Sequence, residues 1–475
     1  MRILIFILFG WAIFSCSKKE YNEKPNIILI MTDDQGWGQT GYYNHPLLET
    51  PNLDEMARNG IRFDRFYAGA PVCSPTRASV LTGRANDRTG VFDHGYALRS
   101  QEKTIAQALK KEGYSTGHFG KWHLNGLRGP GVPILKNDNY SPGKFGFDYW
   151  LSTTNFFDIN PLMSNKGQFV DLKGTSSNII FNEALKLIKK NKEEKSPFFA
   201  VIWDGSPHAP WMANDKDKKD FQNLNEKSQN HYGELVAFDR NIGIFRKKLK
   251  EMNISENTII WFCSDNGGLK NILPETVGGL KGSKGTLWEG GIRVPAIIEW
   301  PALIKQNKIT KYPASTMDIF PTIAEITGID NTEMISPIDG ISLLPIFNST
   351  EEKRKLKIPF RFKDKGALID NDIKLVAISL SEKKFELYNL KNDPKETSDI
   401  SNINSDLFTK MKMEYIEWNE TVNLSLLGED YPEKIVFDQP ESHFWWLDED
   451  YKFYLNEFIK RPEYEQRIKK GLRKD

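Results

Sequence analysis

Cysteine is scarce in this sequence, with 3 residues in a chain of 475. Once Cys16 is assigned to the N-terminal leader, Cys73 and Cys263 remain, and two cysteines cannot form the disulfide framework of a small exported scaffold. A single bond between these two residues stays open as an alternative. Cys263 belongs to the apolar run 259–263, which favours packing as a small hydrophobic side chain instead.

An excess of charge of either sign is also missing. The 64 Lys and Arg residues nearly balance the 63 Asp and Glu residues, which leaves a formal net charge of +1. No segment combines a basic stripe with interleaved aromatic residues, so a role in nucleic-acid binding is excluded. Internal repeats are not seen either. The length favours one large domain with a smaller one beside it.

The N-terminal apolar segment is too short to span a bilayer. Residues 3–14 are apolar and follow Arg2, which is the pattern of an export signal. Residues 13–16 resemble the end of a bacterial lipoprotein signal, with Cys16 as the lipidated residue that anchors the mature chain. Phe14 is bulkier than the residue usual there, so plain signal cleavage stays open. We predict a signal peptide over residues 1–16 and export to the periplasm or to the cell surface as an outer-membrane lipoprotein.

From Pro25 onward, apolar strands alternate with amphipathic helices. This alternation predicts an α/β fold with a mostly parallel central sheet flanked by helices. The expected strands cover residues 26–31, 114–119, 198–203 and 258–263, and the expected helices cover residues 104–112, 177–192 and 232–251.

Charged or ligating side chains follow each expected strand. They are Asp33 and Asp34, then Lys121 and His123, then His208, and finally Asp265 and Asn266. Because the carboxyl ends of parallel strands form the ligand-binding edge of an open α/β sheet, these groups are placed for function. Adjacent buried carboxylates are costly without a cation, and the oxygen ligands among these residues suit Ca²⁺, or less well Mg²⁺, rather than Zn²⁺. A helix N-cap and a solvated carboxylate are the alternative roles for the first pair.

Two local geometries are expected around the basic residues. Lys121 and His123 lie two positions apart, so an extended backbone would point both side chains to one side. The flanking prolines are expected to hold His208 in a rigid extended loop, which would fix it as a proton donor. His118, inside the second strand, is expected to be a satisfied core histidine.

Residues 73–84 predict a short helix with a cysteine at its start. Pro75 has the fixed φ of a first helical residue, and Gly83 supplies the left-handed residue that ends the helix. A helix N-terminus favours anions and lowers the pKa of a cysteine, and Arg77 adds a fixed positive charge one turn later. Cys73 is therefore expected at an anion site. A helix cap with a buried cysteine and a structural arginine is the alternative.

Residues 73–84 resemble the signature of the type I sulfatases, in which the cysteine of Cys-x-Pro-x-Arg is oxidised to formylglycine. The other segments that look like sulfatase sequence are 120–124, 207–210, the Gly-rich basic stretch 280–295, 316–328 and 339–345. The resemblance covers about residues 25–399. It implies an alkaline-phosphatase-like architecture, with a catalytic domain over residues 24–346.

The segments beyond the catalytic domain are predicted from their own patterns. After a charged linker, residues 358–430 are expected to form a smaller C-terminal α+β subdomain. Residues 431–475 form an aromatic and charged tail, with a helical stretch over residues 449–470 that is expected to pack on the surface. A contribution of Trp445 and Trp446 to a sugar subsite stays open.

The resemblance also implies a set of site residues. The implied metal ligands are Asp33, Asp34, Asp265, Asn266 and the modified Cys73, and the implied catalytic residues are Cys73, Arg77, Lys121, His123, His208 and Lys284. Lys281 is expected to be peripheral. The implied partner is a formylglycine-generating or sulfatase-maturating enzyme that oxidises Cys73.

The implied chemistry begins with the hydrate of the formylglycine aldehyde, whose oxygen attacks sulfur. The cation and Arg77 lower the pKa of that hydrate, and Asp265 accepts its proton. Lys121 and Lys284 neutralise the sulfate and, with His208, protonate the leaving alcohol. His123 then takes a proton from the second hydroxyl, so that sulfate is eliminated and the aldehyde re-forms.

Two other functions stay open at this point. A phosphoester or phosphonate hydrolase of the same superfamily would use a similar nucleophile, although Asn266 stands where a dizinc phosphatase is expected to have a histidine ligand. An inactive lipoprotein that only binds sulfated glycans would require an unmodified Cys73. For an exported sulfatase, the expected substrates are sulfated algal polysaccharides such as ulvan, or their oligosaccharides.

Overall fold

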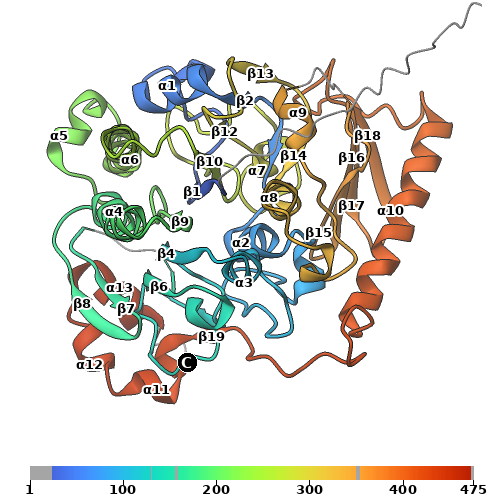
Figure 1. The fold of residues 1–475 in the computed structure, drawn as a ribbon. Helices are drawn as coiled ribbons and strands as arrows, with labels where there is room; N and C mark the ends of the chain where they lie inside the picture. The colour runs from blue at the N-terminus through green and yellow to red at the C-terminus, as the bar shows by residue number, and fades with distance from the viewer. Residues whose placement is uncertain (1–23, 130, 156–158, 349–352, 472–475) are drawn as a thin grey trace, which may run out of the picture.

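The computed structural model describes residues 24–129, 131–155, 159–348 and 353–471. The predicted signal peptide, including Cys16, lies outside these residues. Figure 1 shows a central sheet with helices on both faces and a second sheet backed by a long helix. No helix in the described part of the chain is long and apolar enough to cross a membrane.

The central sheet has ten strands in the order β13, β2, β12, β10, β1, β9, β4, β6, β7, β8. Their bounds are β1 (Asn26–Thr32), β2 (Ile61–Phe63), β4 (Ser115–Lys121), β6 (Tyr149–Thr153), β7 (Leu162–Asn165), β8 (Gln168–Asp171), β9 (Phe198–Trp203), β10 (Thr258–Ser264), β12 (Ala296–Glu299) and β13 (Lys308–Thr310). β10, β1, β9, β4 and β6 run parallel, whereas β12, β7 and β8 introduce antiparallel pairs. The predicted mostly parallel sheet is confirmed, and the carboxyl ends of its central strands meet at one edge.

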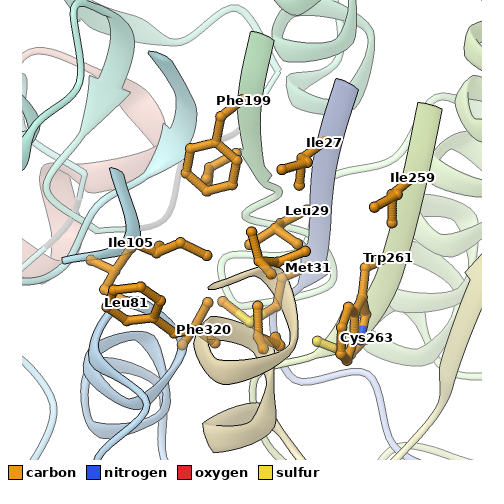
Figure 2. Packing of buried hydrophobic residues seen from close by; sticks show 14 of the residues in the cluster. Ile27, Leu29, Met31, Leu81, Ile105, Phe199, Ile259, Trp261, Cys263 and Phe320 are labelled. Atoms are coloured by element: carbon orange, nitrogen blue, oxygen red, sulfur yellow. The ribbon is translucent and has the colours of Figure 1, made fainter. Parts of the chain in front are cut away.

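β1 is apolar on both sides because helices cover both faces of the sheet. Ile28 and Ile30 pack in one hydrophobic cluster, and Ile27, Leu29 and Met31 pack in the other, as Figure 2 shows for the second set. The covering helices are α1 (Pro51–Asn59), α4 (Ser176–Glu194) and α6 (Glu226–Glu251) on one face, and α2 (Cys73–Thr82), α3 (Ile105–Lys111) and α8 (Ile319–Thr327) on the other. Alternation of side chains along a strand explains this division.

A second, antiparallel sheet follows in the C-terminal part of the chain. It consists of β15 (Ile358–Phe362), β16 (Lys365–Asp370), β17 (Ile373–Ser379) and β18 (Lys384–Asn389), in that order. Helix α10 (Ser405–Leu426) packs on it, with Met411 and Tyr415 buried against Leu375 and Leu387. The predicted smaller C-terminal α+β subdomain is confirmed.

The remaining elements are short. β3 (Phe66–Tyr67), β11 (Arg293–Val294) and β14 (Ala314–Ser315) form a small sheet, and β5 (Leu127–Arg128) pairs with β19 (His443–Phe444). The short helices are α5 (Asp215–Lys218), α7 (Glu289–Ile292), α9 (Leu344–Asn348), α11 (Glu449–Lys452), α12 (Leu455–Phe458) and α13 (Pro462–Gly471).

Two expectations about helices need correction. α6 begins at Glu226 rather than at residue 232, because the Asn225 side chain caps it by accepting a hydrogen bond from the Ser228 N–H at 3.0 Å. The single helical stretch expected over residues 449–470 is broken into α11, α12 and α13.

The side chains of Trp445 and Trp446 are only 1% and 4% exposed, because they pack with α11 to α13, so neither can line a sugar subsite at the surface.

A buried ion cluster joins the C-terminal sheet to α7. The Nζ of Lys374, on β17, lies 3.0 Å from Glu289 of α7 and 2.8 Å from Glu396, and all three side chains are inaccessible to solvent. Burying charges in this way is stable only while the opposite charge is present. The cluster therefore fixes the C-terminal subdomain against the segment that precedes β11.

Replacing Lys374 by methionine is expected to lower the free energy of unfolding by about 3–5 kcal/mol, because buried Glu396 loses its counter-charge and Glu289 keeps only the more distant Arg293, at 3.6 Å. The matched control is Lys365→Met, an exposed lysine on the neighbouring strand β16, with an expected change within about 0.5 kcal/mol. Urea unfolding of both variants measures the difference. Equal stability of the two variants would contradict this account of the interface.

Candidate active site

Hydrogen bonds from the backbone of Asp33 and Asp34 connect the end of β1 to the ends of β9 and β10. The N–H of Asp33 donates to the carbonyl of Ser206, after β9, at 3.0 Å, and the N–H of Asp34 donates to Oδ1 of Asp265, after β10, at 3.1 Å. Asp34 has a φ of 70°, a left-handed conformation that disfavours most L-residues. This turn lets two consecutive carboxyl groups enter one buried cluster, so the alternative of a solvated carboxylate is wrong.

Ligand atoms of several of these residues lie within reach of a single ion. One oxygen each of Asp33 and Asp265 and the Sγ of Cys73 lie within 4.8 Å of one another, and the same holds for Asp33, Asp34 and a ring nitrogen of His208. Asp33 belongs to both groups. The sequence-predicted acidic residues are therefore gathered at one point with the cysteine.

Two buried oxygens at this point have no hydrogen-bond donor. Asn266 donates through Nδ2 to Oδ1 of Asp34 at 2.8 Å, but its own Oδ1 and the Oδ1 of Asp33 accept no hydrogen bond from any residue that the structure describes. Buried acceptors are normally satisfied. Carboxylate and amide oxygens left in this state fit a hard divalent cation such as Ca²⁺ or Mg²⁺.

Three cations surround the three carboxylates. Arg77 is fully buried on α2, and its Nη2 lies 2.8 Å from Asp265 and 3.4 Å from Asp33. Lys121, the last residue of β4, contacts Asp33, and Lys284 lies 2.5 Å from Asp34. Both lysines therefore contact carboxylates of the cluster that contains Cys73.

The carboxyl groups differ in their proton affinity. Burial raises the pKa of Asp33, but Lys121, His208 and Arg77 together bring it well below its ordinary value. For Asp265, burial and the neighbouring negative charge of Asp33 raise the pKa to about 7. Asp265 is thus the carboxyl in this cluster whose pKa stands near neutrality, the property of a group that exchanges protons.

Cys73 is the first residue of α2, with Val72 as N-cap, and Gly83 ends the helix at a φ of 72°. Pro75 is therefore the third helical residue and not the first. Cys73 is 2% exposed, and burial raises its thiol pKa despite the opposing effect of Lys121 and Lys284. The expectation of a lowered thiol pKa is wrong, because loss of hydration outweighs the favourable helix terminus and charges.

Cys263 does not pair with Cys73. Both are free thiols, and Cys263 lies in the hydrophobic cluster beside Trp261 (Figure 2). The disulfide alternative is therefore wrong, and the small-hydrophobe interpretation is confirmed.

The two predicted catalytic histidines adopt unexpected backbone geometries. His123 has a φ of 56°, so the segment after β4 is not extended. Its ring is buried, neither ring nitrogen has a hydrogen-bond partner among the described residues, and burial holds its pKa well below the ordinary value. His208 lies in a turn, with its N–H donating to Gly205 at 3.0 Å, rather than in an extended loop.

His208 nevertheless reaches the acidic cluster. Its Nε2 lies 3.8 Å from Oδ2 of Asp34, and burial lowers its pKa to about 4. The structure thus brings His208 to the same point as the acidic residues. Its role in catalysis stays a prediction.

The residues expected to be peripheral lie outside this cluster. Lys281 Nζ stacks 3.5 Å above the Trp288 ring and donates to the Glu396 carbonyl at 3.0 Å. His118 is buried in the core as expected, with Nδ1 2.7 Å from Ser152 Oγ and its ring against Trp203. It is not fully satisfied, because its Nε2 has no hydrogen-bond partner among the described residues.

One residue that the sequence did not single out lies close to the cluster. The ring of His94 is 6.5 Å from that of His123, and its side chain is 51% exposed. Its loop is fixed next to the cysteine because the Gly95 N–H donates to Ser74 Oγ at 2.8 Å. His94 follows no predicted strand, so no pattern in the sequence pointed to it.

The sheet order and the site at its edge define the class of this protein, an alkaline-phosphatase-like α/β fold. Within that class, the chain belongs to the sulfatase family. The family model described as Sulfatase matches residues 25–329, and a model described as N-sulphoglucosamine sulphohydrolase, C-terminal, matches residues 283–420.

Individual relatives agree with this assignment. N-acetylgalactosamine-6-sulfatase of Canis lupus familiaris is 33% identical over 362 residues, which cover 68% of this chain and 66% of that protein. An ulvan-active sulfatase of Formosa agariphila is 30% identical over 380 residues, covering 73% and 71%. The crystal structure of Ps i-CgsB, also solved in complex with k-i-k-neocarrahexaose, has a TM-score of 0.74 at 26% identity, covering 92% of this chain and 98% of that one. The chain spans about two thirds of the length of the N-acetylgalactosamine-6-sulfatases that it matches.

Proposed function

We propose that this protein hydrolyses sulfate monoesters on carbohydrates. The observation that carries the proposal is the buried cluster in which Arg77, Lys121 and Lys284 contact three carboxylates beside Cys73. Lysines suit a compact tetrahedral anion as point charges, and arginine adds directed hydrogen bonds. Belonging to the sulfatase family supports the choice of sulfate over phosphate.

The orphaned oxygens of Asp33 and Asn266 fit a divalent cation, with Asp34 and Asp265 completing the oxygen set. We propose Ca²⁺, and Mg²⁺ as the less suitable ion, because the donors are hard oxygens in an irregular arrangement. When bound, such an ion supplies Lewis-acid polarisation of a sulfate oxygen. Asp33 and Asp265 would also keep Arg77 oriented, since both carboxylates contact its guanidinium.

Cys73 is proposed to be oxidised to formylglycine by a maturating enzyme. A buried thiol with a raised pKa is a poor nucleophile at neutral pH, whereas an aldehyde at this position supplies a hydrate oxygen as the nucleophile. Within the cluster, Asp265 is proposed to accept the proton that this oxygen loses, because its carboxylate lies beside Cys73.

The remaining side chains divide the work of charge and proton transfer. Lys121 and Lys284 would bind the non-bridging sulfate oxygens. A sulfate bound there would raise the pKa of His208 from about 4, so that His208 with Lys284 would bring a proton to the leaving alcohol. His123 is buried and held neutral, with both ring nitrogens unpartnered among the described residues. A neutral imidazole can accept the proton whose removal releases sulfate.

The proposed substrates are sulfated polysaccharides or their oligosaccharides, of the kind found in algal cell walls. The names of an ulvan-active sulfatase and of an N-acetylgalactosamine-6-sulfatase among the relatives support a glycan substrate. Export through the predicted signal over residues 1–16, with or without lipidation of Cys16, would place the enzyme where such polymers are met.

Competing aryl sulfate and aryl phosphate in one assay tests the reaction class. We expect the purified, matured protein to release sulfate with the larger kcat/KM. Asn266 favours this outcome, because a dizinc phosphatase is expected to have a histidine ligand at this position. Faster release of phosphate would assign the protein to the phosphoester hydrolases, and no release of either would favour a glycan-binding protein without activity.

A further inference from the structure

Two adjoining pockets outside the acidic cluster form one basic groove. Their volumes are about 400 and 620 Å³, and they share Arg65, Lys311, Asp372 and Lys391. The basic residues that line the groove are Arg62, Arg65, Arg293, Lys308, Lys311, Lys353 and Lys391. Asp64 and Asp372 are the acidic residues of the lining, which leaves a surplus of five positive charges among the lining residues in a chain whose net charge is +1. One of the five is compensated from outside the lining, because Arg293 lies 3.6 Å from Glu289.

Packing against aromatic rings holds two of the guanidinium groups in place. Arg293 lies 4.4 Å above the ring of Trp37, whose ring also stacks on Tyr43 at 4.0 Å. The guanidinium of Arg62 lies 5.4 Å from the Tyr42 ring and 5.3 Å from the Tyr43 ring. Guanidinium groups that are already ordered lose little entropy when they bind an anion.

Two of the exposed lysines in the groove, Lys311 and Lys391, carry uncompensated charge. Lys311 follows β13, and Lys391 follows β18, so they project from different subdomains. Neither forms an ion pair with a residue that the structure describes, whereas Arg65 is paired with Asp372 at 2.8 Å. The groove can therefore attract a further anion without breaking an existing pair at these two positions.

Part of the groove lining lies at the same edge of the sheet as the acidic cluster. β2 runs parallel to β1, with β12 and β10 between them. Asp64 directly follows β2, which lies three strand spacings, about 14 Å, across the sheet from β1. Trp37 lines the groove and lies three residues after Asp34 in the same loop.

We propose that this groove binds a second, sulfate-bearing segment of the glycan chain whose other sulfate ester lies in the active site. This inference rests on the proposed function for the identity of the substrate. Two joined pockets with distributed positive charge suit an extended polyanion better than a single small anion, which Lys121 and Lys284 would already hold. The groove would then favour long sulfated chains over short ones.

The test compares Lys311→Gln/Lys391→Gln with a control of equal charge change, Lys189→Gln/Lys192→Gln, two exposed lysines on α4. Dextran sulfate is the probe, and its binding is measured by calorimetry at low and high salt. We expect the groove variant to bind about tenfold more weakly than the control at low salt, with the gap closing as salt screens the charges. Equal binding by both variants would overturn the proposal, as would a DNA oligonucleotide that competes as well as dextran sulfate.

Kinetics separate this proposal from the function on which it rests. If the wild type releases sulfate, the groove variant should show a KM raised about tenfold for a sulfated polysaccharide, with kcat and the hydrolysis of aryl sulfate unchanged. An unchanged KM for the polymer would overturn the groove. If the wild type releases no sulfate from any ester, the proposed function fails, while weaker binding of dextran sulfate by the groove variant would still support an anionic-glycan groove.

Discussion

Replacing Cys73 by alanine is expected to reduce sulfate release by about 10⁴-fold or more, because removal of a nucleophile leaves only the catalysis supplied by binding and charge. The side chain is 2% exposed at the start of α2. Alanine keeps the helix and removes only the sulfur, so the fold should be retained. The measurement is kcat/KM for an aryl sulfate, with the urea midpoint as a check on folding.

The matched control is Cys263→Ala, the same substitution at the other buried cysteine of the described chain. Cys263 packs in the hydrophobic cluster beside Trp261, and its loss should reduce stability by about 1 kcal/mol and leave kcat/KM within about twofold. Comparable activity in the two variants would show that Cys73 is a structural residue, which was the alternative for the signature segment.

The exchange of Asp33 for asparagine is expected to reduce kcat/KM by about 10³-fold and to remove the bound cation. Asp33 takes part in both groups of ligand atoms, and it contacts Lys121 and Arg77. Asparagine has nearly the same shape, but it leaves these two cations short of one negative charge and weakens the oxygen set. The loss of Lewis-acid stabilisation alone amounts to several kcal/mol.

Asp204→Asn is the matched control for this experiment. Asp204 is a fully buried carboxyl after the neighbouring strand β9, and its Oδ1 accepts a hydrogen bond from the Ser206 N–H at 3.0 Å, which an asparagine can also accept. Metal content by elemental analysis and activity should both fall for Asp33→Asn and stay near wild type for Asp204→Asn. Restoring a chelated wild-type enzyme with Ca²⁺ and then with Mg²⁺ distinguishes the two ions. Full activity after exhaustive chelation would contradict the metal assignment.

The architecture and the gathering of the acidic residues were predictable from the sequence for one physical reason. Buried parallel strands are continuous apolar runs, so Asn26–Thr32 and Thr258–Ser264 stand out, and parallel strands end at a common edge. Any polar residue directly after such a run is brought to that edge. The proximity of Asp33 and Asp265 could therefore be predicted from the sequence alone.

Other features depend on contacts that the local sequence does not encode. The raised pKa of Cys73 reflects burial under neighbouring elements, which opposes the local effect of the helix N-terminus. The left-handed backbone of Asp34 and His123 is imposed by packing, because neither is glycine. His94 reaches its position through a loop bound to Ser74, and the basic groove combines residues from the catalytic domain and the C-terminal subdomain. Tertiary packing sets these properties, and the periodicity of apolar residues in the sequence does not predict that packing.

The C-terminal tail is a second case in which the local sequence did not predict burial. Its aromatic residues suggested a role at the surface, yet Trp445 and Trp446 fill a hydrophobic cluster with Leu127, Val132 and Leu162. An aromatic pair in a polar segment has no periodicity that tells core from surface. The pairing of β19 with β5 and the packing of α11 to α13 place these rings inside.

The central claim is that Cys73 is the precursor of the catalytic group. Mass spectrometry of the peptide that contains Cys73, taken from active protein made in a host with the maturating enzyme, tests it most directly. We predict the mass of a peptide in which the CH₂–SH side chain has become an aldehyde, in proportion to the specific activity of each preparation. A fully active preparation whose peptide retains the mass of unmodified cysteine would contradict the account.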